Sequence, residues 1–437
     1  MSEEKMNLKI ENRDKMKLLL KNGQVISPLK KVNDTLDIYI EDGVIKEIGK
    51  TLHKENVQVY DLSGKTITPG FIDMHVHLRE PGFEYKENIE SGSTAARKGG
   101  FTSICCMPNT NPIIDNEDTV RFIQHKSNNL LNDVFVIAAV TKGNEGKELA
   151  PILELKNAGV IAYSDDAMPI ANAEIQRRIM EYLSMNDDLF IQHCEDQTLT
   201  KNGLMNESFV STALGFAPIP SIAEEIFVSR GIIMTEYLNT RYHIAHVSTK
   251  KSVELIRQAK AKGIKVTAEA CPHHFTLTDE AVRSFDTNTK MNPPLRTAED
   301  VEAIQEGLKD GTIDVIATDH APHAIHDKDV EYAYAPFGIV GLETAVGLTY
   351  SAFVSNKLFS MEEMIKKLSL NPRKILKLPE IKIEVGEKAN LTILDQNIKW
   401  VVNINEFHSK SKNSPYNGYE LSCKACGVVN NSKIEIF

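Results

Sequence analysis

Short apolar segments recur through the middle of the chain, and most are followed by a stretch with helical periodicity. The segments AEEIFVSRGIIMTEYL and KKSVELIRQAKAKG are two such helical stretches. Continuous apolar strands that alternate with helices are typical of a parallel sheet covered on both faces, and eight such units close a barrel. The sequence therefore predicts an α/β fold with a TIM-type (β/α)8 barrel, whose strands we expect at 71–77, 101–107, 134–140, 159–164, 189–194, 242–247, 263–270 and 313–319.

Both ends of the chain carry a different pattern, in which apolar and polar residues alternate between turns. The N-terminal part contains Asn22-Gly23 and Asp42-Gly43, dipeptides typical of tight hairpins. Neither end is large enough to bury a sheet-on-sheet core alone, so we expect the two ends to form one small β-sandwich module. The predicted division is a polar N-terminal extension over 1–16, module segments over 17–68 and 381–437, and the barrel over 69–380.

Composition restricts the possible functions. The 437 residues are 42% hydrophobic and 25% charged, as in an ordinary soluble enzyme. The formal net charge of -10 argues against nucleic-acid binding, which needs an excess of Lys and Arg. No apolar run approaches the roughly 20 residues that span a bilayer, and the first residues contain no apolar signal-peptide core. We therefore expect a cytoplasmic protein without a membrane partner.

The six cysteines are too few to form a disulfide framework in a chain of this length. Cys423 and Cys426 form a single C-x-x-C, without the second pair that a zinc knuckle needs. We interpret them as ordinary thiols, with a redox or metal role as the alternative.

The polar residues that end the predicted strands are mostly histidines and aspartates. Active sites of such barrels lie at the carboxyl ends of the strands, and histidine and aspartate are residue types that bind zinc or transfer protons. In the His75-x-His77 pair, both imidazoles lie on one face of a strand, because side chains alternate with period two. The strand-end residues are His75, His77, Asp165, Asp166, His193, His246, Asp319 and His320.

Each of these residues also has a structural interpretation. A single histidine at the end of an apolar strand is commonly a buried, hydrogen-bonded side chain, and Asp319 could cap the segment that follows it. Four imidazoles that converge on one barrel mouth, however, are costly to bury without a cation. We therefore expect a metal site, at which Asp319 accepts a proton from water activated by the metal.

The motifs in this order resemble those of class I (bacterial-type) dihydroorotases of the amidohydrolase superfamily. The resemblance extends over nearly the whole predicted barrel, and the order and spacing of the motifs fit. The matching segments are TPGFIDMHVHLREPG (68–82), GGFTSICCMPNTNP (99–112), YSDD (163–166), QHCED (192–196), AHVS (245–248), EACPHH (269–274), KMNPPLR (290–296), ATDHAPH (317–323) and PFGIVGLET (336–344).

The resemblance implies a zinc site with one or two ions. His75 and His77 would hold one metal and His193 and His246 a second, with Asp166 as the bridging carboxylate and its neighbour Asp165 as the alternative. It also implies that Asp319 is a metal ligand and the general acid and base. The implied substrate-binding residues are Arg79, Asn109, Asn292 and His323, with the backbone of Phe337 and Gly338.

The implied reaction is the reversible cyclisation of N-carbamoyl-L-aspartate to L-dihydroorotate and water, the third step of de novo pyrimidine (UMP) biosynthesis. In the hydrolytic direction, hydroxide on the metal is the nucleophile. Because the substrate is anionic and the protein acidic, a local cation is needed, and Arg79, two residues after His77 on the same alternating face, can donate two hydrogen bonds to a carboxylate. The alternatives are a salt bridge of Arg79 with Glu80 or Glu84, a turn role for Asn109 and a loop-ordering role for His323.

Two other functions remain open. A hydantoinase or allantoinase would share the scaffold, but hydantoinases commonly use a carbamylated lysine, and the strand-four segment AYSDDA has none. A non-catalytic scaffold that assembles with aspartate carbamoyltransferase is the second alternative, and a homodimer is the expected oligomer. We also expect 320–338 to form a mobile lid, with His326 on the surface.

Overall fold

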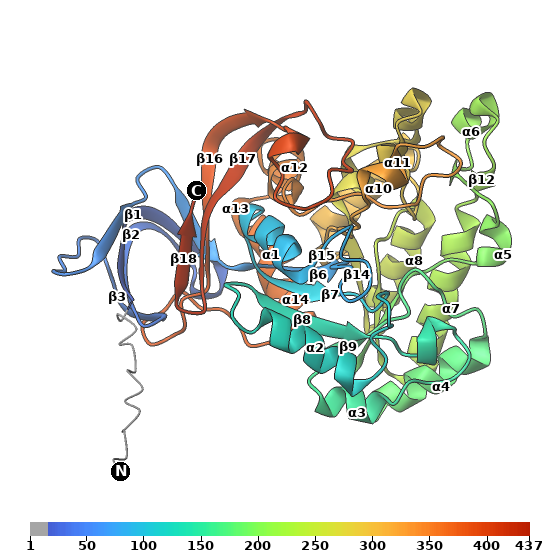
Figure 1. Ribbon diagram of the computed structural model, residues 1–437, viewed down its shortest axis with the longest axis horizontal. Helices are drawn as coiled ribbons and strands as arrows, with labels where there is room; N and C mark the ends of the chain where they lie inside the picture. The colour runs from blue at the N-terminus through green and yellow to red at the C-terminus, as the bar shows by residue number, and fades with distance from the viewer. Residues whose placement is uncertain (1–15) are drawn as a thin grey trace, which may run out of the picture.

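The computed structural model describes residues 16–437, so the N-terminal extension predicted over 1–16 lies almost wholly outside the described residues. The described chain consists of a barrel surrounded by helices and a sheet module at one side of it (Figure 1). The blue and red ends of the chain meet in this module, as the alternating pattern at both ends predicts. No helix among these residues is long and apolar enough to cross a membrane.

Eight parallel strands form the barrel, one in each of the eight predicted segments. They are hydrogen-bonded in the order β15-β14-β13-β10-β9-β8-β7-β6. The two outer strands approach each other through a parallel bridge between Val76 and His320, where the His77 N–H donates to the His320 carbonyl at 2.8 Å. The strands are β6 (Phe71–Val76), β7 (Phe101–Cys106), β8 (Asp133–Ala138), β9 (Ala162–Tyr163), β10 (Leu189–Gln192), β13 (Arg241–Ile244), β14 (Val266–Ala270) and β15 (Val315–Ile316).

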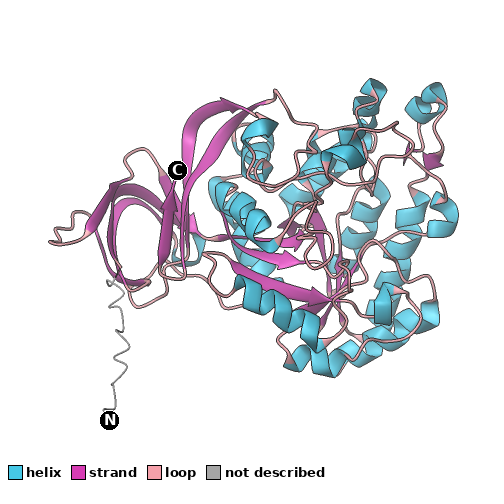
Figure 2. Cartoon of the chain, in the orientation of Figure 1, coloured by secondary structure: helices cyan, strands magenta, loops and turns pink. Residues whose placement is uncertain are grey.

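Helices cover the outside of the barrel (Figure 2). Several begin with a polar cap: the Asn88 side chain accepts from the Ser91 N–H at the start of α1, and Asn116 accepts from Thr119 at the start of α2. The main helices are α1 (Ile89–Lys98), α2 (Glu117–Ser127), α3 (Ile152–Asn157), α4 (Ala173–Ser184), α7 (Ile222–Leu238), α8 (Lys250–Ala261), α10 (Ala298–Asp310), α12 (Ala345–Thr349), α13 (Met361–Ile365) and α14 (Asn371–Ile375).

Shorter elements lie in the loops that follow the strands. They are α5 (Gln197–Thr200), α6 (Phe209–Leu214), α9 (Pro272–Thr276), α11 (Ile325–Lys328), and the small pair β11 (Met205–Asn206) and β12 (Pro218–Ile219).

The module is one continuous mixed sheet, whereas the sequence pattern predicts a sandwich. Asp42-Gly43 forms the expected hairpin turn, with φ angles of 52° and 75°. The hairpin predicted at Asn22-Gly23 is wrong: this dipeptide lies inside β1, where Asn22 has φ 60°, the register shifts, and the Asn22 N–H donates to Asp37 Oδ1. The strands are β1 (Lys17–Ser27), β2 (Val32–Glu41), β3 (Val44–Gly49), β4 (Gln58–Asp61), β5 (Thr66–Pro69), β16 (Leu391–Val401), β17 (Glu420–Asn430) and β18 (Lys433–Ile436).

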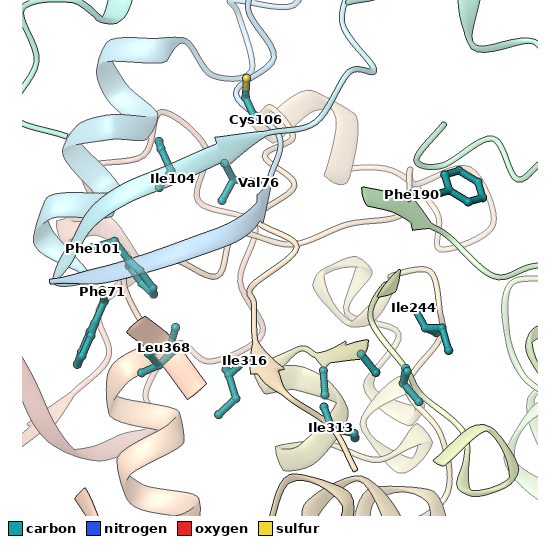
Figure 3. Packing of buried hydrophobic residues seen from close by; sticks show 14 of the residues in the cluster. Phe71, Val76, Phe101, Ile104, Cys106, Phe190, Ile244, Ile313, Ile316 and Leu368 are labelled. Atoms are coloured by element: carbon teal, nitrogen blue, oxygen red, sulfur yellow. The ribbon is translucent and has the colours of Figure 1, made fainter. Parts of the chain in front are cut away.

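Alternating strand residues divide the barrel core into two layers. Residues such as Phe71, Ile104 and Phe190 point outward and pack under the helices, and Figure 3 shows part of this layer. Their neighbours, among them Ile72 and Cys105, belong to a separate inner cluster. Ile375 and Leu376, at the end of α14, pack against this inner cluster.

Candidate active site

Asp166 lies at the centre of the predicted histidine cluster, just beyond the end of β9. Its Oδ1 is 3.5 Å from His75 Nε2, and its Oδ2 is 3.4 Å from His77 Nε2. The same Oδ1 lies 3.9 Å from His193 Nδ1 and 3.7 Å from His246 Nε2. Two groups of potential ligands, His75-His77-Asp166 and Asp166-His193-His246, therefore share one buried carboxylate.

Second partners fix the orientation of three of these rings. His75 Nδ1 donates to Glu269 Oε1 at 2.6 Å, His77 Nδ1 donates to Asn109 Oδ1 at 2.7 Å, and His193 Nε2 donates to Glu195 Oε2 at 3.2 Å. When these rings are neutral, the other ring nitrogen therefore carries a lone pair, and that nitrogen faces Asp166. Such an outer hydrogen bond is the usual support of a metal-binding histidine.

The described side chains fit a cation at this place. His75 Nε2 and Asp166 Oδ1 are buried and have no hydrogen-bond partner among the described residues, although such atoms are usually satisfied. His193 Nδ1 and His246 Nε2 face each other at 3.0 Å, an arrangement that requires a shared proton or a cation. Imidazole and carboxylate donors are the set that suits zinc and similar divalent ions.

Charge interactions within the cluster keep the Asp166 carboxylate ionised and favour a positive charge on the His75 ring, although burial opposes both. Burial alone would raise the pKa of Asp166, but His75, His246 and His77 hold it well below its usual range. Burial likewise opposes protonation of His75, yet Glu269 and Asp166 raise the pKa of this ring. The cluster thus attracts positive charge, which a metal ion supplies without protonating the ligands.

The structure separates the two aspartates between which the sequence could not choose. Asp165 turns away from the histidines and accepts hydrogen bonds from the Val140 N–H at 2.8 Å, the Thr141 N–H at 3.1 Å and the Thr141 hydroxyl. Asp166 alone of the pair faces the ring nitrogens. Asp165 thus ties the loop after β9 to the end of β8.

Asp319 lies at the same barrel mouth, just after β15. Its Oδ1 is 2.9 Å from His77 Nε2 and 3.5 Å from His75 Nε2. Burial would raise its pKa, but the hydrogen bond with His77 and the charge of His75 lower it, so the carboxylate is ionised. The preceding residue is held by Asp73, whose carboxylate accepts from the Thr318 N–H at 3.2 Å.

A pocket of about 230 Å³ opens over the cluster, and it brings together every residue of the predicted substrate set. Arg79, the cation of that set, has its Nε donating to the Pro322 carbonyl at 3.1 Å. The pocket is lined by His77, Arg79, Asn109, Asp166, Ala167, His193, His246, Asn292, Asp319, Ala321, His323, Phe337 and Gly338.

Arg79 forms neither of the salt bridges, with Glu80 or with Glu84, that were the alternative to carboxylate binding. Glu80 instead pairs with Lys126 and accepts from the Ile89 N–H, and Glu84 accepts from the Gly82 N–H. Burial lowers the pKa of Arg79 to about 10, so the guanidinium stays charged at neutral pH. Arg79 lines the same pocket as His77, as expected, but a turn and not strand alternation brings it there, because β6 ends at Val76 and Arg79 has a left-handed φ of 63°.

The other predicted substrate residues are fixed by neighbours. Asn109 Oδ1 is occupied by His77, so its amide N–H groups remain to donate. Asn292 Nδ2 donates to Glu195 Oε2 at 3.1 Å. His323 Nε2 donates to the Phe337 carbonyl at 2.8 Å, and its Nδ1 accepts from Lys86 Nζ at 3.3 Å.

His323 is a neutral ring in this arrangement. Burial, with the charges of Arg79, Lys328 and Lys86, lowers its pKa to about 2. It orders the wall of the pocket through the Phe337 carbonyl, and among the residues that line the pocket Arg79 is the one with a cationic side chain.

Two buried lysines hold the segment 320–338, and sequence reasoning missed both. Lys290 Nζ donates to the carbonyls of Tyr332 and Ala333 at 2.8 and 3.0 Å. Lys328 Nζ donates to those of Thr287, Lys290 and Pro336. The Gly338 N–H also donates to the Lys290 carbonyl at 3.0 Å. These bonds hold the Phe337–Gly338 wall of the pocket in place. That the segment 320–338 moves as a lid stays a prediction.

Two further expectations can be checked. The His326 side chain is 74% exposed, as predicted. Cys423 and Cys426 are free thiols and belong to none of the potential metal groups of the described residues. One such group was not expected, Cys271-His273-His274, but His274 Nε2 already donates to the Pro293 carbonyl. A larger cavity of about 560 Å³ is lined in part by Trp400, Cys426 and Phe437 and by no residue of the potential metal groups.

The barrel, the sheet module built from both chain ends and the buried His/Asp cluster, which could hold a metal, are together typical of an amidohydrolase. Solved structures agree on the fold: an L-hydantoinase (dihydropyrimidinase) from Arthrobacter aurescens superposes with a TM-score of 0.86 at 24% identity, covering 97% of each chain. A dihydropyrimidinase from Brevibacillus agri gives 0.84 at 22% identity, covering 96% of this chain and 95% of the other.

Sequence comparison identifies the family. A family model described as dihydro-orotase-like matches residues 64–252. The dihydroorotase of Ruminiclostridium cellulolyticum is 51% identical over 408 residues, 93% of this chain and 95% of that protein. The dihydroorotase of Acetivibrio thermocellus is 50% identical over 407 residues, with the same coverage. The chain belongs to the dihydroorotase family of cyclic amidohydrolases.

Proposed function

We propose that this protein catalyses the reversible cyclisation of N-carbamoyl-L-aspartate to L-dihydroorotate and water, a step of pyrimidine biosynthesis in the cytoplasm. The observation that carries the proposal is one pocket in which a charged arginine faces a paired His/Asp cluster. The cluster suits hydrolysis of a cyclic amide, and Arg79 suits the carboxylate that distinguishes dihydroorotate from uncharged hydantoin rings.

His75, His77, Asp166, His193 and His246 would hold the metal, with Asp166 shared if two ions bind and Asp319 as a further ligand. Zinc bound there would polarise the reacting carbonyl and lower the pKa of water. The outer acceptors Glu269, Asn109 and Glu195 keep the ring nitrogens directed at it.

Asp319 is proposed as the proton carrier. In the hydrolytic direction its ionised carboxylate accepts a proton from the attacking water and donates it to the ring nitrogen as the C–N bond breaks. In the cyclising direction the same carboxyl starts protonated and gives this proton to the substrate carboxylate oxygen. It then accepts the N–H proton of the attacking carbamoyl nitrogen and passes it to the same oxygen, which leaves as water. Its lowered pKa keeps the carboxylate ionised and therefore able to accept the proton in hydrolysis.

The remaining pocket residues orient the ring. The Arg79 guanidinium, held through Nε, can direct its remaining N–H groups at the substrate carboxylate. Asn109 and Asn292 present amide groups, and the Phe337–Gly338 backbone can meet the ring amides. His323 keeps that backbone in place.

The test is an activity assay on protein of known metal content, with dihydroorotate, hydantoin and allantoin supplied separately. We expect turnover of dihydroorotate alone, lost with a chelator and restored by zinc. Turnover of hydantoin or allantoin in preference to dihydroorotate would contradict the proposed substrate. Chelator-resistant turnover would contradict the metal.

The proposed assembly has two levels. We expect a homodimer, and co-elution with aspartate carbamoyltransferase in size-exclusion chromatography would establish a larger complex. Separate elution of the two proteins under varied salt and ligand would contradict the complex with aspartate carbamoyltransferase. The scaffold alternative fails if the isolated chain is active.

A further inference from the structure

A further group of potential metal ligands lies in the turn that follows β14. Cys271 comes directly after the strand, and His273 and His274 lie in the short helix α9. One ligand atom of each residue lies within 4.8 Å of those of the other two. The three side chains are between 0% and 3% exposed, so anything bound between them would be enclosed by protein.

This group is distinct from the His/Asp cluster of the candidate active site. It shares no residue with the two groups that contain Asp166. None of its three residues lines the pocket that opens over the cluster. The proposed cyclisation therefore uses none of these side chains, and their convergence needs another explanation.

The polar atoms of this group lack the partners that buried polar atoms normally have. His274 Nδ1 is buried and has no hydrogen-bond partner among the described residues. Within residues 16–437, neither the Cys271 thiol nor the ring of His273 forms a hydrogen bond. Buried groups left in this state usually meet an ordered water molecule or an ion.

The outer hydrogen bond of His274 prepares its other nitrogen for a metal. Nε2 donates to the Pro293 carbonyl at 3.0 Å, so a neutral ring carries its lone pair on Nδ1. An outer bond of this kind is the usual support of a metal-binding histidine. Burial lowers the pKa of His273 to about 4, so this ring is also neutral, the form that binds a metal.

The donor set and its spacing favour a metal ion. Cysteine sulfur and imidazole nitrogen are typical ligands of zinc, and the distances of about 2.3 Å to sulfur and about 2.0 Å to nitrogen place two ligands at most about 4.3 Å apart. The observed limit of 4.8 Å therefore needs little closure. One water molecule could also meet the three groups, by donating to both rings and accepting from the thiol, and the experiment below separates the two occupants.

We propose that Cys271, His273 and His274 bind a divalent ion of the zinc class, separate from the metal of the His/Asp cluster. The thiol releases its proton to solvent when the ion binds, and the thiolate becomes a ligand. His274 also holds the Pro293 carbonyl, and Pro293 follows Asn292, which lines the pocket. The ion would therefore have a structural role, in which it joins the turn after β14 to the loop that carries Asn292.

The test replaces zinc by cobalt in the full chain, produced in cells supplied with Co²⁺ so that the ion enters during folding. Thiolate sulfur bound to Co²⁺ gives an intense charge-transfer band in the near ultraviolet, whereas imidazole and carboxylate ligands do not. The His/Asp cluster contains no cysteine, so its own cobalt adds no such band. We expect the band in the wild type. Cys271→Ala should lose both the band and one cobalt ion per chain.

Cys194→Ala is the matched control. Cys194 is also buried and is adjacent to His193, but its thiol already lies 3.2 Å from the Tyr242 hydroxyl. It belongs to no potential metal group of the described chain. The control should therefore keep the band and the full cobalt content. Circular dichroism confirms that each variant is folded.

A second variant tests the histidines and leaves the thiol in place. His273→Gln should weaken or abolish the band, because two protein ligands hold the ion less well than three. A wild-type cobalt protein without the band overturns the proposal and favours water. A band that persists in Cys271→Ala, or that disappears in folded Cys194→Ala, overturns the ligand assignment. The spectrum and the cobalt content do not depend on turnover, so these outcomes are independent of the proposed function.

Discussion

Replacement of Arg79 by alanine should remove the recognition of the substrate carboxylate while leaving the metal ligands untouched. The guanidinium lines the pocket, is oriented by the bond from Nε to the Pro322 carbonyl, and forms no ion pair with a carboxylate of residues 16–437. Its charge is therefore available to a ligand. Removing one partner of a buried charge pair costs about 2–4 kcal/mol, which corresponds to a loss of roughly 30- to 1000-fold in kcat/KM.

The assay is designed to separate lost recognition from general damage. kcat/KM is measured for dihydroorotate and for dihydrouracil, the same ring without the carboxylate. Arg79→Ala should lower the first value strongly and the second little, so the preference for dihydroorotate collapses. Arg121→Ala is the matched control, because Arg121 makes only an exposed ion pair with Glu117 on α2.

Two results would refute this reasoning. Near wild-type kcat/KM for dihydroorotate in Arg79→Ala would show that the carboxylate is held elsewhere. An equal loss on both substrates, or a loss of bound metal, would show that Arg79 supports the site and does not recognise the ligand. Arg79→Lys should recover only part of the loss, since an ammonium cannot form the two parallel hydrogen bonds of a guanidinium.

Three further predictions concern the cluster and the loop that covers it. Asp319→Asn should lower kcat by about 100- to 10,000-fold with metal retained, which metal analysis beside the activity assay checks. Asp166→Ala should lower the metal content, whereas Asp165→Ala should keep it and instead lower the melting temperature; the reverse pattern would contradict the geometry. Burial lowers the pKa of Lys328 to about 7 from 10.5, so between these pH values the unfolded chain binds more protons than the folded chain, and stability attributable to this group rises with pH. Lys328→Met should remove that part of the rise, as thermal melts across this pH range would show.

The barrel was predictable because each strand is a buried apolar run, and all eight runs contain a strand. The lengths of the strands were not predictable, because hydrogen bonding depends on partners that are distant in the chain. Strands β9 and β15 are only two residues long. The wrong prediction of a hairpin at Asn22-Gly23 has the same origin. The dipeptide supplies a positive φ, but whether this ends the strand or only bulges it depends on the opposite strand.

The His/Asp cluster was predictable from the residues at the strand ends. The side chains that hydrogen-bond to the outer nitrogens of its rings were not. Glu269 accepts from His75 and from His243 inside the barrel, yet in the sequence it is a single carboxylate in the strand segment 263–270. That isolation was the available signal, because a buried carboxylate needs partners. Lys290 and Lys328 offered no comparable signal, since their acceptors are backbone carbonyls.

Backbone strain explains why side-chain direction at the site could not follow from strand periodicity. Arg79, His246 and Asp319 have φ angles of 63°, 32° and 49°, each just beyond a strand of the barrel. A non-glycine residue in this region costs about 1–3 kcal/mol and persists only where surrounding contacts impose it. Those contacts are present: Pro322 holds Arg79, and Asp73 holds the residue before Asp319. The chain therefore turns sharply where each strand ends, and this turn, not alternation, directs the three side chains into one pocket.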